Sequence, residues 1–234
     1  MRNLLRWTLY LLFRILTRLT VTGIENIPSE GGCLLTGNHL GLIDGPLIFC
    51  LIPRSDATGL VARKHQQNPI IRFVVEGAGG IWINRSITDF GALKKARSYL
   101  KSGGLLGIAP EGTRSPTGAL IEAKSGVAFL ADKSGVVILP EATTGSEVSI
   151  KQLFKFQRPE VHVRFGRPYR LPPLDRLNKD VSIKRNTEEI MCRIAAMLPQ
   201  PYRGFYAEHP RTYELGKENE GTIKSLHPTS NIKE

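Results

Sequence analysis

CLLTGNHLGLID, from Cys33 to Asp44, joins a short apolar run to a polar loop that carries a histidine and an aspartate. The run, together with the glycine before it, has the length and composition of a buried strand. Similar runs lie at 59–62, 80–83, 104–109, 136–139 and 161–165, and helical patterns occupy 89–101, 126–133 and about 182–198. This alternation predicts an α/β fold: a single layered domain with a mixed, mostly parallel sheet flanked by helices.

His39 and Asp44 in this loop form a candidate catalytic pair. On a straight helix they would point about 140° apart, but Gly41 between them permits a sharp turn that would bring them together. An aspartate bonded to one imidazole nitrogen fixes the tautomer and leaves the other nitrogen free to take a proton from a hydroxyl. A structural alternative stays open, because Asp44 before Gly45-Pro46 is also a good helix N-cap.

Cations and hydroxyls follow two other predicted strands. The block PEGTRS at 110–115 contains Arg114, whose planar guanidinium matches phosphate. Arg85 lies next to the end of the block 79–86, and Lys124 lies downstream. Ligands bind at strand ends along one edge of an α/β sheet, so these three cations gathered there would form a phosphate pocket. Taken singly, each cation is more often a solvated surface charge.

In order, these blocks resemble the 1-acylglycerol-3-phosphate acyltransferase family, the glycerolipid acyltransferases with an H-x4-D motif. The resemblance spans roughly residues 23–207. Its blocks are N-H-x4-D at 38–44, an apolar block ending in Arg-Ser at 85–86, P-E-G-T-R-S at 110–115 and an apolar block containing Pro140, with further similarity at 60–64 and, in a bacterial-looking version, at 198–204.

The resemblance implies an activity: transfer of a fatty acyl chain from acyl-CoA or acyl-ACP to the sn-2 hydroxyl of 1-acyl-sn-glycerol-3-phosphate (lysophosphatidic acid), giving phosphatidic acid. His39 would be the general base and Asp44 would orient it, with direct attack on the thioester and no acyl-enzyme. The acceptor site would comprise Arg85, Glu111, Gly112, Thr113 and Arg114, and Lys124 would join the substrate-binding residues. One departure concerns the last block, where Pro140 is followed by Glu141 instead of valine, which puts the identity of the acceptor in doubt.

Composition narrows the possible partners. The 234 residues carry a net charge of +11, with 41% hydrophobic and 23% charged residues, which indicates one globular domain attracted to polyanions. Only 7% are aromatic and none interleave with basic residues, which argues against nucleic acid. The three cysteines and five histidines are dispersed, so we expect no metal, no cofactor and no disulfide framework.

The two ends of the chain differ from its centre. Residues 1–21 are rich in leucine but interrupted by four arginines on one side, which is typical of an amphipathic helix lying on an anionic membrane surface; a helix packed on the domain with its arginines in water is the alternative. We therefore expect a membrane-associating helix at 1–21, an acyltransferase domain at 22–206 and a flexible polar tail at 207–234, with peripheral or monotopic attachment to the cytoplasmic face of the cell membrane.

Three other functions remain in competition. The acceptor of an acyltransferase could be another lysophospholipid or a lyso-aminolipid. A basic module that binds nucleic acid is a second alternative, and a lipid-binding protein without catalysis is a third. An intact His39 and Asp44 argue against the last, because binding alone does not need that pair.

Overall fold

One sheet organises the protein. The computed structural model describes residues 2–226, and the side chains of residues 2–218. The sheet has seven strands in the order β1-β7-β6-β2-β5-β3-β4, and every neighbouring pair is parallel except β6 and β7. Their bounds are β1 Arg18–Thr22, β2 Cys33–Gly37, β3 Thr58–Ala62, β4 Ile81–Ile83, β5 Leu105–Ile108, β6 Val137–Thr144 and β7 Glu160–Phe165. The predicted mixed, mostly parallel α/β sheet is confirmed.

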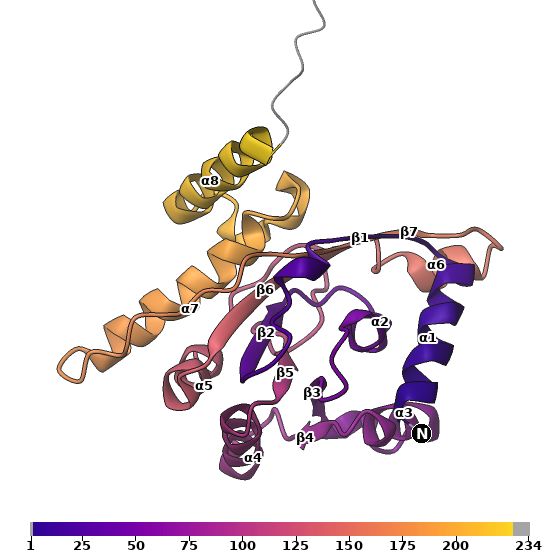
Figure 1. The fold of residues 1–234 in the computed structure, drawn as a ribbon, viewed down its shortest axis with the longest axis horizontal. Coiled ribbons are helices and arrows are strands. Elements are labelled where there is room, and N and C mark those ends of the chain that lie inside the picture. The colour runs from indigo at the N-terminus through magenta and orange to yellow at the C-terminus, as the bar shows by residue number, and fades with distance from the viewer. Residues whose placement is uncertain (1, 227–234) are drawn as a thin grey trace, which may run out of the picture.

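Helices cover both faces of this sheet (Figure 1). Leu35, Leu105 and Leu139 pack with α1 and α2, whereas their sequence neighbours Leu34 and Leu106 pack with α4, α5 and α7. Each central strand is therefore apolar on both sides, as expected of a sheet buried between helical layers. The helices are α1 Arg2–Leu16, α2 Asp44–Leu51, α3 Pro69–Gly77, α4 Phe90–Lys101, α5 Gly126–Ser134, α6 Ser149–Leu153, α7 Lys179–Ala195 and α8 Pro210–Leu226, with short 3-10 turns η1 Ile24–Asn26, η2 Arg63–His65, η3 Gln200–Tyr202 and η4 Gly204–Tyr206.

The N-terminal helix is shorter than predicted. It ends at Leu16, and residues 18–22 form β1, an edge strand parallel to β7. Leu19 and Val21 of this strand pack against the core under α1 and α2, and the β-branched residues at 20–22 favour a strand over a helix. The sheet of the acyltransferase-like domain therefore starts at Arg18 and not at residue 22.

Two arginines of α1 face the domain, against the prediction that this side of the helix meets headgroups. Arg2 donates to the backbone carbonyl of Ala57, and Arg6 donates to that of Arg54 at 2.6 Å. Both guanidinium groups lie 5.7 Å from the ring centroid of Phe49. Hydrogen bonds and cation–π contacts thus fix α1 to the domain, which leaves much of its apolar surface outside.

The expected flexible tail is wrong for residues 210–226, which form the helix α8. Thr212 and Leu215 are buried where α8 packs against α7, and Arg211 forms an ion pair with Glu189 of α7 at 2.8 Å. Sequence patterning alone missed this helix because its apolar positions are few. The end of the predicted tail, 227–234, lies outside the described residues.

The loops that carry the candidate residues all leave the same edge of the sheet. β2, β5, β3 and β4 are successive parallel neighbours, so the segments after them emerge together. These segments are 38–44 after β2, 109–118 after β5, η2 after β3 and 84–86 after β4.

Candidate active site

The loop 38–44, here called the catalytic loop, turns back on itself around Asp44. The carboxylate oxygen Oδ2 of Asp44 bonds His39 Nδ1 at 2.8 Å and accepts the backbone N–H groups of Leu40 at 2.7 Å and Gly41 at 2.8 Å. Gly41 is needed here because a Cβ at this position would lie 2.5 Å from the backbone oxygen of Ser146. The predicted turn at Gly41 thus brings His39 and Asp44 together.

Asp44 does not act as the helix cap of the structural alternative. It is the first residue of α2, whose N-cap position is Ile43 with no side-chain cap bond. Its carboxylate instead bonds groups of the catalytic loop, at His39, Leu40 and Gly41. An ionised Asp44 can only accept at Nδ1, so in a neutral imidazole the ring proton lies on that nitrogen and Nε2 of His39 keeps a lone pair to accept a proton. The His39 side chain is 24% exposed and that of Asp44 only 7%.

Glu111 holds the backbone of His39 from the other side. Its carboxylate accepts the N–H of His39 through Oε1 and the N–H of Ile121 through Oε2, each at 3.0 Å. Burial raises the pKa of Glu111 above its ordinary value, while the two N–H bonds act in the opposite direction. Ser115 also holds the backbone of His39, because its N–H donates to the His39 carbonyl at 2.8 Å.

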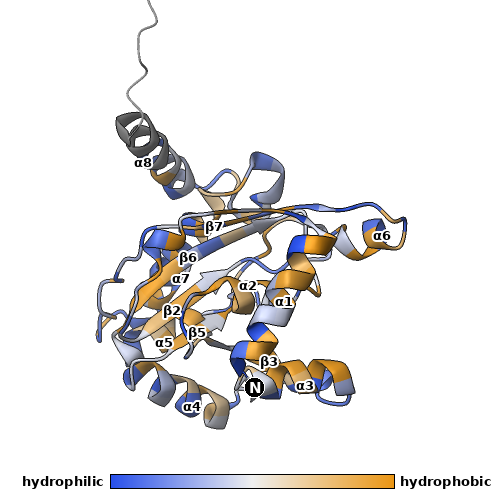
Figure 2. Cartoon of the chain, turned by 45° about the vertical axis from the view of Figure 1, so that its right-hand side comes forward, coloured by the Kyte–Doolittle hydropathy of each residue, from blue (hydrophilic) through white to orange (hydrophobic). Residues whose placement is uncertain are grey.

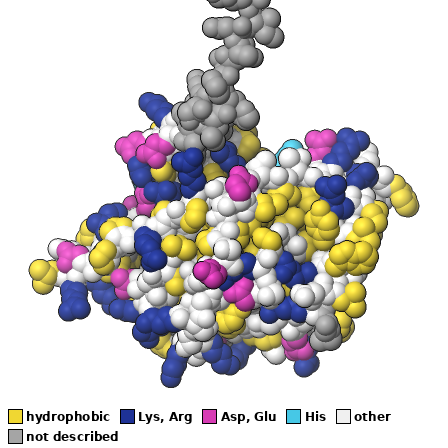
Figure 3. All heavy atoms as spheres, viewed as in Figure 1, with side chains coloured by type: hydrophobic (Ala, Val, Ile, Leu, Met, Phe, Trp, Pro, Cys, Tyr) yellow, Lys and Arg dark blue, Asp and Glu magenta, His cyan; other side chains and the backbone are white. Residues whose placement is uncertain are grey.

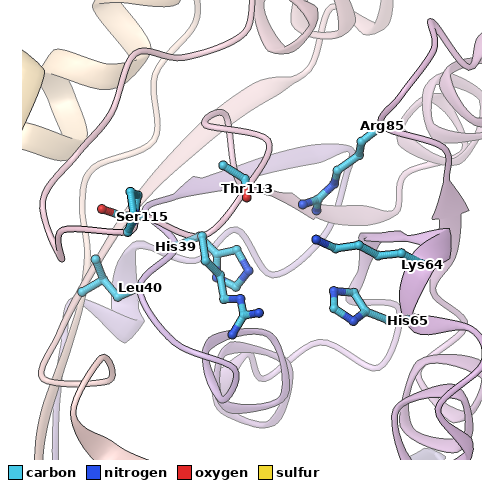
Figure 4. Close-up of a pocket in the computed structure, with 9 residues that line it drawn as sticks. His39, Leu40, Lys64, His65, Arg85, Thr113 and Ser115 are labelled. Carbon is cyan, nitrogen blue, oxygen red and sulfur yellow. The ribbon is translucent and has the colours of Figure 1, made fainter.

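A pocket of about 290 Å³ opens beside His39. Figure 4 shows Lys64, His65 and Arg85 reaching into it from the side opposite His39. Burial, followed by the charges of Lys64, Arg114 and Arg85, lowers the pKa of His65, so this imidazole is neutral at pH 7. The complete lining is His39, Leu40, Lys64, His65, Arg85, Thr113, Arg114, Ser115 and Pro116.

The predicted substrate-binding residues divide into two groups. Arg85, Thr113 and Arg114 line the pocket as predicted. Gly112 lies at its edge with φ +71°, and its carbonyl accepts a hydrogen bond from Arg85 at 2.7 Å. A Cβ on Gly112 would approach Lys124 Cδ to 3.0 Å, so Lys124 packs over this glycine outside the lining.

Glu111 is placed differently from the prediction, and Glu141 also lies outside the pocket. Glu111 is 2% exposed and supports the catalytic loop instead of lining the pocket. Glu141, the departure from the family pattern, is also 2% exposed and does not line the pocket.

Lys64 and His65 are the basic pocket residues that sequence reasoning did not assign. The sequence feature that could have indicated them is the apolar run 58–62 just before them. This run is β3, and it ends at the same sheet edge as β2 and β5. The sequence block 60–64 had been matched to the resembled family without a role for its lysine.

Comparison with known proteins agrees with this geometry. The sequence model of the family described as Acyltransferase matches residues 18–144. The chain belongs to this acyltransferase family. The matched region of the chain holds β1 to β6 and every predicted site residue, whereas α1 and the elements after β6 lie outside it.

Named relatives are similar to this chain over about half of its length. A 1-acyl-sn-glycerol-3-phosphate acyltransferase of Borreliella burgdorferi is 35% identical over 125 residues, 53% of this chain and 50% of that protein. One of Cocos nucifera is 31% identical over 139 residues, covering 56% and 42%. The chain thus spans half or less of the length of these curated relatives.

A solved structure extends the likeness to most of the fold. The 1-acyl-sn-glycerophosphate (LPA) acyltransferase PlsC from Thermotoga maritima superposes with a TM-score of 0.62 at 25% sequence identity. The match covers 81% of this acyltransferase and 76% of the PlsC chain.

Proposed function

We propose that this acyltransferase moves a fatty acyl chain from an acyl thioester to the sn-2 hydroxyl of 1-acyl-sn-glycerol-3-phosphate, giving phosphatidic acid. The observation that carries the proposal is one pocket that combines His39, its Nε2 free to accept a proton, with the cations Lys64, Arg85 and Arg114. A base and an anion site at this spacing suit an acceptor that bears both a hydroxyl and a phosphate. The names of the relatives support the same acceptor.

In the proposed reaction, Nε2 of His39 takes the proton of the acceptor hydroxyl as its oxygen attacks the thioester carbonyl. The new C–O bond forms, the C–S bond breaks, and the imidazolium returns its proton to the departing thiolate. Asp44 holds the ring through Nδ1 and stabilises the imidazolium. A thioester is reactive enough that positioning and one base suffice, so no metal or cofactor is invoked.

Direct attack without an acyl-enzyme agrees with the state of the three thiols and of the Ser115 hydroxyl. All three thiols are buried, and burial raises the pKa of Cys33 and Cys50 to about 12 and that of Cys192 to about 11. The hydroxyl of Ser115, which lines the pocket, already donates to the carbonyl of Ala119 at 2.5 Å. None of these four groups is prepared to carry an acyl chain.

The proposal includes peripheral attachment to an anionic membrane through α1 and its neighbours. Leu4, Trp7 and Ile15 of α1 are more than half exposed, as is Phe73 of α3. Figure 2 shows α1, α3 and α6 on one side of the molecule with hydrophobic segments on each, and Figure 3 shows hydrophobic side chains gathered over α1 and α6. Within residues 2–226, no helix has the length and apolar character that crossing a bilayer requires.

Basic residues border this apolar surface. Lys151 of α6 and the following Lys155 and Arg158 are exposed, and Arg158 donates to the carbonyls of Arg14 at 2.9 Å and Thr17 at 2.7 Å, which ties this segment to the end of α1. Apolar side chains beside cations match the interface of an anionic leaflet. Since coenzyme A and acyl carrier protein are both cytoplasmic donors, the proposed location is the cytoplasmic face.

The deciding experiment measures transfer from a labelled acyl thioester to 1-acyl-sn-glycerol-3-phosphate on vesicles containing anionic lipid. We expect labelled phosphatidic acid, and less of it as salt weakens vesicle binding. Parallel reactions offer a lysophospholipid with a larger headgroup and a lyso-aminolipid. Faster transfer to either of these would replace the acceptor in the proposal, and no transfer to any would refute it.

A further inference from the structure

Glu141 lies on β6 beside the end of β2, where the chain continues into the catalytic loop. It pairs with Gly37 in the last step of the β2–β6 ladder, and Gly37 is followed by Asn38 and His39. The carboxyl group packs against the backbone of Gly37 so closely that a methyl group there would overlap Oε2. An acid at 141 and a glycine at 37 are therefore a matched pair in this chain.

The residue two positions along β6 holds Asn38. The Asn38 side chain donates to the carbonyl of Thr143 and accepts its N–H, both at 2.8 Å. The Thr143 hydroxyl in turn donates to Oε1 of Glu141. Glu141 and Thr143 thus form one linked support under the two residues that precede His39.

No cation balances this carboxyl group among the described residues. Its polar partner is the neutral Thr143 hydroxyl, Phe165 lies opposite it on β7, and the charge acting on it is the negative Asp44 of α2. A carboxyl group buried in such surroundings stays protonated, because its charge would be both desolvated and repelled.

We propose that Glu141 is a positioning residue for His39: as a neutral acid it fills the space against Gly37 and, with Thr143, fixes the strand end from which the catalytic loop projects. This inference rests on the proposed role of His39 as the base. It extends that role by adding a built-in alkaline limit, since ionised Glu141 would place a second buried charge near Asp44 and disturb the loop.

Burial, together with Asp44, raises the pKa of Glu141 from 4.5 to about 8. Neutral at pH 7, the group would ionise in the range where hydroxyl acylation is otherwise helped by base. The pH profile therefore separates a positioning acid from an inert filler, because only the former makes activity fall as it ionises.

The test compares wild type, Glu141→Gln and Glu141→Ala from about pH 6 to 10, with Glu160→Gln as the control for an exposed carboxylate of the same region. We expect Glu141→Gln to keep most of the neutral-pH kcat and to lose the decline above about pH 8. Glu141→Ala should lower kcat about tenfold or more with little change in either KM, since a loosened loop misplaces the base. An unaltered alkaline decline in Glu141→Gln, or full activity in Glu141→Ala, would overturn the proposal.

A second arm uses the Gly37 contact. Gly37→Ala should lower kcat because its methyl group meets the carboxyl group, and adding Glu141→Ala should restore part of the loss because the methyl then fills the vacated space. If the double variant shows the summed loss in kcat of the two single variants, the contact between Gly37 and Glu141 is contradicted.

A third arm does not depend on the acceptor. The imidazole NMR signals of His39, identified by their absence in His39→Gln, should show an inflection near pH 8 in wild type that Glu141→Gln removes. If this inflection is present while no lysolipid is acylated, the proposed function fails and the coupling stands. If transfer occurs without the inflection, the coupling fails alone.

Discussion

The catalytic loop and the cationic wall of the pocket (Lys64, Arg85 and Arg114) lie together but are held in different ways. In the loop, buried carboxylates of Asp44 and Glu111 hold three successive backbone N–H groups. In the wall, the side chains of Lys64 and Arg114 are exposed and form no ion pair or hydrogen bond within the described part of the chain.

This contrast separates two tasks. Under the proposed function, His39 is fixed as the base before any substrate arrives, which favours the rate of the chemical step. In the wall, Lys64 and Arg114 form no such bond within the described residues, and under the proposed function a bound anion would supply their partners. Changes in the loop should therefore act on kcat and stability, and changes in the wall on the KM of the acceptor.

The largest effect is expected for His39→Ala. Removing the base should lower kcat by about 10²–10⁴-fold without unfolding the protein, because the Asp44 and Glu111 bonds to the backbone remain. Steady-state transfer assays measure it, with the exposed His162→Ala as control. Activity retained in His39→Ala would remove the loop from catalysis.

A smaller effect, confined to the acceptor, is expected for Arg114→Ala. Loss of a charge-assisted bond to phosphate should raise the acceptor KM by about 10- to 100-fold and leave the thioester KM unchanged. The exposed Lys94→Ala on α4 is the control. An unchanged acceptor KM would mean that the acceptor carries no phosphate at this wall.

Glu111→Gln tests whether the loop depends on a carboxylate. The amide can accept only one of the two N–H groups, so we expect a loss of about 1–3 kcal/mol in the free energy of unfolding and a several-fold fall in kcat. Urea titration measures the first quantity. The exposed Glu122→Gln should change neither, and equal behaviour of the two variants would show that the two bonds contribute nothing.

The last prediction concerns stability as a function of pH. The pKa of Glu141 lies above its unfolded value of 4.5 and reaches about 8 when folded, so its contribution to stability is complete below pH 4.5 and is lost as the pH rises to about 8. Glu141→Gln lacks this titration. The difference in urea midpoint between Glu141→Gln and wild type should therefore grow in favour of the variant from pH 4.5 to about 8 and stay constant above that. A difference that is the same at every pH would contradict a buried neutral acid.

Much of this site was accessible from the sequence because it depends on local geometry and on strand order. The His39–Asp44 contact needs only a turn at Gly41, and parallel strands bring Arg85 and Arg114 to one edge. The support by Glu111 was hidden, because it joins segments 72 positions apart and its partner is a backbone N–H. No residue pattern records such a bond.

The ends of the chain were less predictable for a different reason. The arginine spacing of α1 indicates amphipathicity but not which side meets the domain, since that depends on the free carbonyls of Arg54 and Ala57. Likewise, α8 is held by Arg211 and Glu189 instead of a regular apolar stripe. The orientation of α1 and the formation of α8 therefore both depend on contacts with residues far away in the sequence.

The pairing of β1 has a consequence for the order of assembly. Its one partner among the described strands is β7, and the ion pair between Arg18 and Glu160 spans 142 positions. During synthesis, β1 has to wait for most of the polypeptide before its ladder can close, and contacts this distant in sequence form late. The helix just before it, α1, therefore emerges from the ribosome well ahead of the completed sheet, and its leucines are accessible to a nearby bilayer before the domain has folded.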